Sequence, residues 1–80
     1  MDPCLGEIRL FAFNWAPEGW LLCDGRILPI NDHRAVFSLL GTTYGGNGQN
    51  CFALPNLVGK EPIPGSKYCI CVEGTYPVRQ

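Results

Sequence analysis

The segment that decides the fold runs from Trp20 to Ile30 and reads WLLCDGRILPI. Two apolar runs, Leu21 to Cys23 and Ile27 to Leu28, flank the dipeptide Asp24-Gly25. Asp-Gly is a strong signal for a two-residue turn, because both central positions of a type I′ turn require a positive φ. The segment therefore predicts a β-hairpin.

Short strand candidates lie on both sides of this segment. Glu7 to Phe13 carries apolar groups on both alternating faces, which predicts a strand that is covered on both sides. Cys51 to Leu54 is a second candidate and is ended by Pro55. Tyr68 to Val72 is rich in residues that favour strands and is the third. These segments indicate a mainly β protein.

One helix is predicted, over Asp32 to Leu40. Its apolar residues recur at helical spacing, and Asn31 or Asp32 offers a side-chain oxygen to cap its start. Gly41 can close its C-terminal end. His33 lies in the first turn, where an exposed histidine is ordinary.

Length and composition point to one small domain over residues 1–80. Hydrophobic residues make up 46% of the chain, which excludes disorder by composition. Ten glycines and seven prolines favour short elements and tight turns over long helices. We expect a mainly β fold with one short α-helix, a small α+β domain.

Charge and hydropathy exclude several classes of partner. The net charge is −1 and the six basic residues are scattered, so the chain has no electrostatic footprint for nucleic acid. No apolar run approaches the roughly 20 residues that span a bilayer, so we expect no membrane insertion. Residues 1–4 are acidic and lack an apolar stretch, so we expect no signal peptide in this sequence.

Nothing in the chain indicates catalysis or a bound group. The Gly-rich segment Gly45 to Gly48 lacks the Lys-Ser/Thr of a phosphate-binding loop and follows a helix instead of opening one. Cys69 and Cys71 share one face of a strand, but the chain has no C-x₂-C pair, and His33 is the only histidine. We expect no catalytic, cofactor-binding or metal-binding residues and no enzymatic activity.

The cysteines and aromatic residues leave alternatives open. The chain has five cysteines, an odd number. This suggests an intermolecular bridge or a free thiol in an oxidising compartment, and small core residues in a reducing one.

We expect the aromatic side chains of Phe11, Trp20, Phe37 and Phe52 in the core, while the choice between core and surface is left open for Phe13, Trp15 and Tyr44. The candidate assembly surface comprises Phe13, Trp15, Tyr68, Ile70 and Val72.

Five stretches of the chain stand out as motifs: GEIRLFA at residues 6–12, APEGW at residues 16–20, LCDG, FSLLGTTYGGNG and the segment from Phe52 to Gly59. Together they resemble the phage tail-collar domain family, which includes the so-called microcystin-dependent proteins. The residues of this chain that match the family signature are Gly19, Trp20, Cys23, Asp24, Gly25, Gly41, Tyr44, Gly45, Gly46, Gly48, Phe52, Leu54 and Pro55.

The resemblance implies a small β-rich fold, a structural role in tail fibres and related assemblies, and an extracellular or virion-associated location. It carries no catalytic residues. Relatives usually have a long Gly-rich insertion before the last strand, whereas here only Lys60 to Lys67 bridges that gap. Four cysteines are atypical of the family and are candidates for inter-subunit or intrachain disulfides: Cys4, Cys51, Cys69 and Cys71.

The expected function is self-assembly into a homo-oligomer or fibre, with copies of the chain itself as partners. Exposed strand edges invite strand addition from a neighbour, and a head-to-tail contact that does not close generates a filament. The alternative is a stand-alone binding module, either a soluble inhibitor or an adhesin whose tip takes a cell-surface glycan or receptor.

Overall fold

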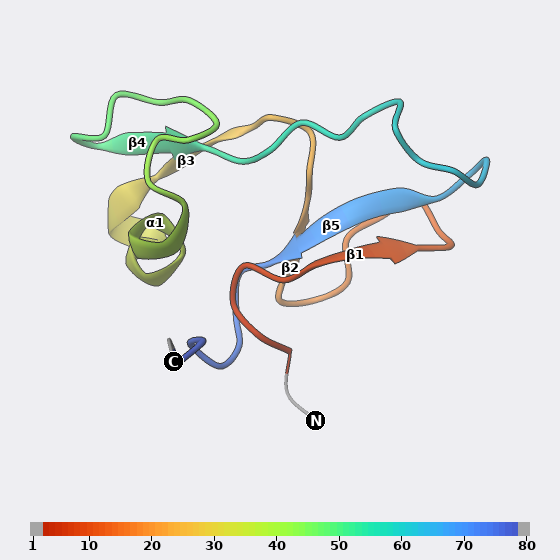
Figure 1. The fold of residues 1–80 in the computed structure, drawn as a ribbon, viewed down its shortest axis with the longest axis horizontal. Helices are drawn as coiled ribbons and strands as arrows, with labels where there is room; N and C mark the ends of the chain where they lie inside the picture. Colours follow the sequence, from red (N-terminus) through yellow and green to blue (C-terminus); the bar gives the residue numbers. More distant parts are fainter. Residues whose placement is uncertain (1–2, 79–80) are drawn as a thin grey trace.

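The computed structural model describes residues 3–78, and short strands make up most of its regular structure (Figure 1). Strand accounts for 29% and helix for 13%, which confirms a mainly β, small α+β domain with one α-helix. The elements are β1 (Ile8–Phe11), β2 (Trp20–Leu22), β3 (Ile27–Pro29), a 3-10 turn η1 (Ile30–Asp32), α1 (Arg34–Leu40), β4 (Cys51–Ala53) and β5 (Lys67–Cys71).

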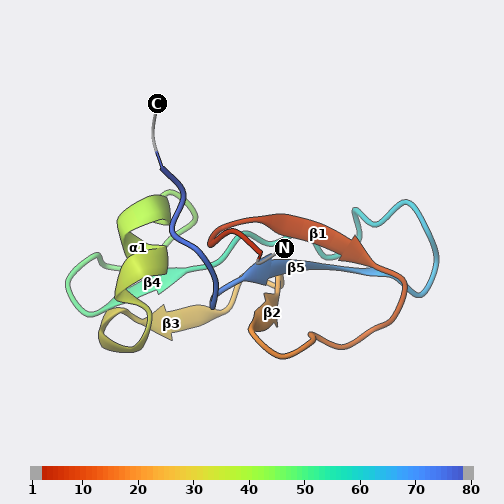
Figure 2. The same cartoon turned by 90° about the horizontal axis from the view of Figure 1, so that it is seen from below.

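The strands form two small antiparallel sheets. The first has three strands in the order β1-β5-β2, so the strand that comes last in the chain lies in the middle. The second consists of β3 and β4, and α1 lies beside it (Figures 1 and 2). The predicted strand over residues 68–72 is therefore confirmed as β5, shifted by one residue.

The hairpin predicted at Asp24-Gly25 is wrong. β2 pairs with β5, whereas β3 pairs with β4, so the two runs on either side of the dipeptide belong to different sheets. Gly25 does adopt a positive φ of 80°, but it bends the chain from one sheet to the other without reversing it. The turn signal is local, and it was outweighed by pairing with distant segments of the chain.

The ladder between β3 and β4 extends back through this bend. Ile27 lies opposite Ala53, and the same register continues to the bridge between Asp24 and Asn56. The N–H of Gly25 donates to the carbonyl of Pro55 at 3.2 Å. Residues 20–29 therefore act as one extended run that leaves the first sheet and enters the second.

The core has two parts, one on each face of the first sheet. The main cluster lies between both sheets and α1, and its buried members are Leu5, Cys23, Leu28, Val36, Phe52, Leu54 and Ile70. The smaller cluster lies on the opposite face of β5, and it comprises buried Trp20, Cys69 and Cys71 with half-buried Phe11, Ala16 and Leu22. The strand predicted over Glu7 to Phe13 is confirmed as β1, but its predicted cover on both faces is wrong, because β1 lies at the edge of the sheet with Ile8 and Arg9 exposed.

The helix starts later than predicted and lacks the predicted cap. Residues Ile30–Asp32 form the 3-10 turn, and His33 takes the N-terminal cap position of α1 without a side-chain hydrogen bond. The side-chain oxygen of Asn31 instead accepts a hydrogen bond from the guanidinium of Arg34 at 3.0 Å. The predicted C-terminal glycine is confirmed, since the N–H of Gly41 donates to the carbonyl of Phe37 at 2.7 Å.

The Gly-rich loop after α1 folds back onto β4. The side-chain oxygen of Asn47 accepts from the backbone N–H groups of Gln49, Asn50 and Cys51, which fixes the loop internally. Gly46 has a φ of 93°, and a Cβ there would lie 2.4 Å from Cα of Phe52. Only glycine permits this approach of the loop backbone to the strand.

We predict that Gly46→Ala destabilises the fold far more than Gly59→Ala does. Gly59 also has a positive φ, but a Cβ there meets nothing within 4 Å, so its substitution costs backbone strain alone, roughly 1 kcal/mol. At Gly46 the forced displacement of β4 adds about 1 to 3 kcal/mol of overpacking. Urea unfolding of the two variants measures the difference, and equal losses would contradict the close contact.

Candidate assembly surface

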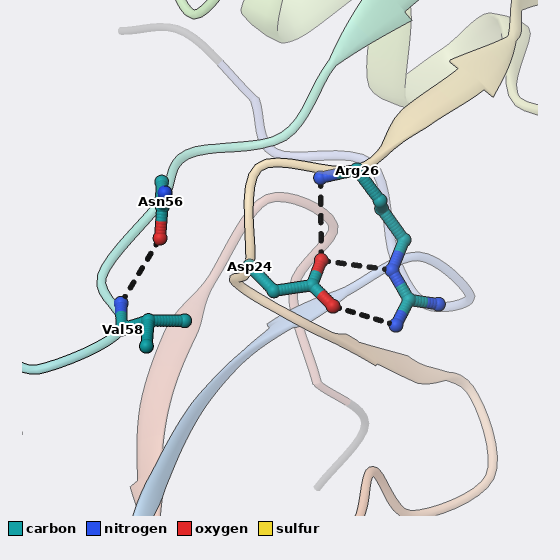
Figure 3. A network of polar contacts seen from close by, with 4 residues as sticks. All are labelled: Asp24, Arg26, Asn56 and Val58. Atoms are coloured by element: carbon teal, nitrogen blue, oxygen red, sulfur yellow. Dashed lines mark hydrogen bonds and ion pairs between the residues drawn. The ribbon is translucent and has the colours of Figure 1, made fainter.

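The bend between the two sheets is held by a compact polar network (Figure 3). The carboxylate of Asp24 accepts hydrogen bonds from the backbone N–H of Arg26 at 3.2 Å and from Nε and Nη2 of its guanidinium, each at 3.0 Å. On the facing strand, Oδ1 of Asn56 accepts from the N–H of Val58 at 3.2 Å. Each of the two paired segments thus has its local conformation fixed by its own side chain.

The hydrogen bonds from Arg26 lower the pKa of Asp24 from its usual value. The carboxylate is therefore charged under neutral conditions and stays charged into mild acid. Both side chains are more than a third exposed. Solvent screens such a pair, so its contribution to stability is small.

Most of the family-signature residues either are glycines at turns and close backbone approaches or have side chains buried in the core. Cβ of an alanine at position 25 would lie 3.2 Å from Cβ of Asn56, and the carbonyl of Gly19 accepts from the N–H groups of Val72 and Glu73. The buried signature side chains are Trp20, Cys23, Phe52, Leu54 and Pro55. Tyr44 is the exception, since its side chain is exposed.

The aromatic residues form a continuous stack that leads from the small core cluster to the surface. Phe11 meets Trp20 edge-on at 5.2 Å between ring centroids and lies 5.3 Å from Phe13. Phe13 in turn stacks on Trp15 at 4.4 Å, with an interplanar angle of 27°. Trp15 ends the stack and is 59% exposed.

The structure separates the five residues of the predicted assembly surface. Trp15 is exposed and Phe13 is half-buried next to it. Tyr68 and Val72 are half-buried and pack against the main core. The placement of Ile70 on this surface is wrong, because Ile70 has 0% exposure in the central strand β5, with neighbouring strands on both sides.

The cysteines differ sharply in access to solvent. All five are free thiols in the structure, with Cys4 and Cys51 half-buried and Cys23, Cys69 and Cys71 buried. Burial raises the pKa of the Cys23 thiol to about 11, and it raises those of Cys69 and Cys71 as well. In the folded chain, Cys69 and Cys71 are therefore out of reach of a second copy.

Potential metal ligands and a surface hollow are the remaining features of the described residues that concern binding. No three side chains of His, Cys, Asp or Glu converge on a metal-sized site within residues 3–78. An open hollow between α1 and the C-terminal segment is lined by Ser38, Leu39, Tyr76, Pro77 and Val78. Its polar groups are the Ser38 and Tyr76 hydroxyls, which bond to each other at 2.7 Å.

The sequence profile of the Phage Tail Collar Domain family matches residues 6–62, which is well over half of the chain. The chain therefore belongs to the phage tail collar domain family, a family of structural domains, and a structural, virion-associated role in a phage tail follows from that membership. A search of curated protein sequences found no match.

Two further findings concern the helices and the part of the chain that the family match covers. None of the helices in residues 3–78 has the length and apolar character needed to cross a bilayer. The matched region ends before β5, so the central strand of the first sheet comes from outside it. Residues 63–66 connect the matched region to β5.

We predict that Asp24→Asn lowers the free energy of unfolding at pH 7 by less than about 1 kcal/mol. Because the folded pKa is depressed, the wild-type advantage is full above the ordinary carboxyl pKa of about 3.9 and disappears as the pH falls through the folded value. Urea unfolding between pH 2 and pH 7, run beside the exposed Asp32→Asn, measures this. A wild-type advantage that grows in acid would contradict the pairing.

We predict that two of the five thiols react rapidly with a disulfide reagent in the native protein. Cys4 and Cys51 are accessible to the reagent. Cys23, Cys69 and Cys71 react only after the protein unfolds, because their thiols are buried and protonated. Spectroscopic thiol titration at pH 8 gives the two phases, and Cys51→Ser removes one equivalent from the fast phase. Fast reaction of more than two thiols would contradict the burial pattern.

Proposed function

We propose that this protein is a structural building block of a phage tail or a tail-like extracellular fibre, and that it assembles with copies of itself. The observation that carries the proposal is the pair of small sheets with open edges. β1 and β2 bound the first sheet and β3 bounds the second, whereas the outer side of β4 is covered by the Gly-rich loop through the hydrogen bond from the N–H of Ala53 to the carbonyl of Gly45. Such edges present backbone N–H and C=O groups to a neighbouring chain.

The size of the core supports association. A chain of this length buries only about 60 to 65% of the surface that its unfolded form exposes, so its stability alone is marginal. Several large apolar side chains remain exposed, among them Ile8, Trp15, Ile27, Val58 and Ile63. Contact between copies would remove part of this surface from water, and each Å² of apolar area buried contributes about 25 cal/mol.

Burial limits how cysteines take part in the proposed assembly. Of the four cysteines atypical of the family, only Cys4 and Cys51 are partly exposed. Covalent links between copies would therefore use these two, and the non-covalent contacts would survive reduction. Cys69 and Cys71 instead fill the small core cluster beside Trp20.

The alternative function, a stand-alone binding module, has one observation in its favour. The exposed ring of Trp15 stacks on Phe13, which makes a flat aromatic platform held by the rings beneath it. Such a platform suits an amphipathic ring such as a sugar. It would serve an adhesin that takes a cell-surface glycan.

Sedimentation velocity and negative-stain microscopy of the full chain, each with and without reductant, test the proposal. We expect species larger than a monomer in both buffers, with any additional growth in oxidising buffer abolished by Cys4→Ser and Cys51→Ser together. A monodisperse monomer in both buffers contradicts self-assembly. Saturable glycan binding by that monomer, lost in Trp15→Ala, would establish the binding module in its place.

A further inference from the structure

β1 is an edge strand, and its hydrogen bonds to β5 identify which of its backbone groups are left free on the outer side. The N–H of Cys71 donates to the carbonyl of Glu7 at 2.9 Å, and the register then places Arg9 opposite Cys69 and Phe11 opposite Lys67. In an antiparallel ladder alternate residues bond to the same neighbour, so Arg9 and Phe11 bond toward β5 as the carbonyl of Glu7 does, while the N–H of Glu7 donates to the carbonyl of Cys4. The backbone groups of Ile8 and Leu10 therefore point outward, away from the sheet.

The side chains along this edge divide into a charged face and an apolar face. Glu7 and Arg9 are two residues apart and share one face, where Arg9 forms an ion pair with Glu7 and lies 5.5 Å from the Trp20 ring. Ile8 and Leu10 occupy the other face, and Ile8 is 40% exposed. Figure 2 shows β1 along the margin of the sheet, with β5 on its inner side.

This pattern is complementary to itself. If β1 meets β1 of a second copy antiparallel, with Ile8 opposite Ile8, then each Glu7 lies opposite Arg9 of the other copy. The four charges alternate in sign, and on the other face the two Ile8 side chains bury each other. In the next register that uses the outward backbone groups, Arg9 lies opposite Arg9, and like charges directly opposite destabilise a strand pair.

We propose that β1 pairs with β1 of a second copy about a two-fold axis at Ile8, joining the two three-stranded sheets into one continuous sheet. This inference rests on the proposed function and specifies its first contact. The contact is the same patch on both copies, so it closes as a dimer. Growth beyond the dimer would use other surfaces, and the dimer is the repeating unit.

Ile8→Lys tests the contact, with Ile63→Lys as the matched control. The first places two cations on the two-fold axis, whereas Ile63 lies in the connection before β5 and is 55% exposed. In sedimentation velocity with reductant, we expect Ile8→Lys to weaken dimerisation at least about tenfold. We expect Ile63→Lys to match the wild type, and circular dichroism verifies that both variants are folded.

A charge-exchange experiment tests the register with folded, full-length chains. Glu7→Arg and Arg9→Glu should each dimerise poorly alone, because each places like charges opposite each other. Mixed in equal amounts they should dimerise, since both opposite-charge pairs return. Glu18→Arg mixed with Lys60→Glu, two exposed positions outside β1, controls for general attraction between oppositely charged chains.

The outcomes separate this inference from the proposed function. A wild-type protein that associates, while Ile8→Lys associates equally well, overturns pairing through β1 and leaves self-assembly standing. Charge variants whose mixture dimerises no better than the control mixture overturn the register centred on Ile8. A wild type that is monomeric in every buffer overturns the inference and the proposed function together.

Discussion

Two hydrogen bonds at Cys23 join the halves of this protein. Its N–H donates to the carbonyl of Tyr68 in β5 at 2.9 Å, and its carbonyl accepts from the N–H of Leu57 at 2.8 Å. One residue thus ends the pairing of the first sheet and begins that of the second. The main core fills the space between the sheets, so its shape depends on the angle that the chain takes at this residue and at Gly25.

The residues from Cys23 to Gly25 suit the passage of the chain between the two sheets. Cys23 is small and buried, so the two sheets can approach each other closely. Asp24 turns toward Arg26 on the solvent side of the bend, and Gly25 has a positive φ of 80° at a position where a Cβ would lie 3.2 Å from Cβ of Asn56. In this protein the Cys23-Asp24-Gly25 segment therefore carries one strand from the first sheet into the second.

Sequence reasoning found the elements that depend on local chemistry and missed those that depend on distant partners. The end of α1 at Gly41 and the strand character of β5 were predictable, because each follows from its own residues. The wrong prediction of a hairpin at Asp24-Gly25 could not be corrected from sequence, because the segment that pairs with β3 lies far along the chain, near residues 51–57. Ile70 looked like a surface strand residue because its pattern does not show that β5 is central.

The same limit applies to the candidate assembly surface. The exposure of Trp15 was left open by sequence reasoning and was decided by how Phe13 stacks beneath it. The alternation of Glu7 and Arg9 around Ile8 is visible in the sequence, yet it has no meaning until β1 is known to be an edge. Assignment of β1 to an edge required β5, which pairs with β1 from nearly the opposite end of the chain.

The central position of β5 also has a consequence for biosynthesis. Strands β1 and β2 do not pair with each other, so the first sheet has no hydrogen-bonded partner for either of them until residues 67–71 have left the ribosome. Contacts between such distant segments form slowly, because the chain must close a large loop before any bond compensates the lost entropy. The nascent chain therefore exposes two unpaired strands outside the ribosome until β5 emerges and pairs with both.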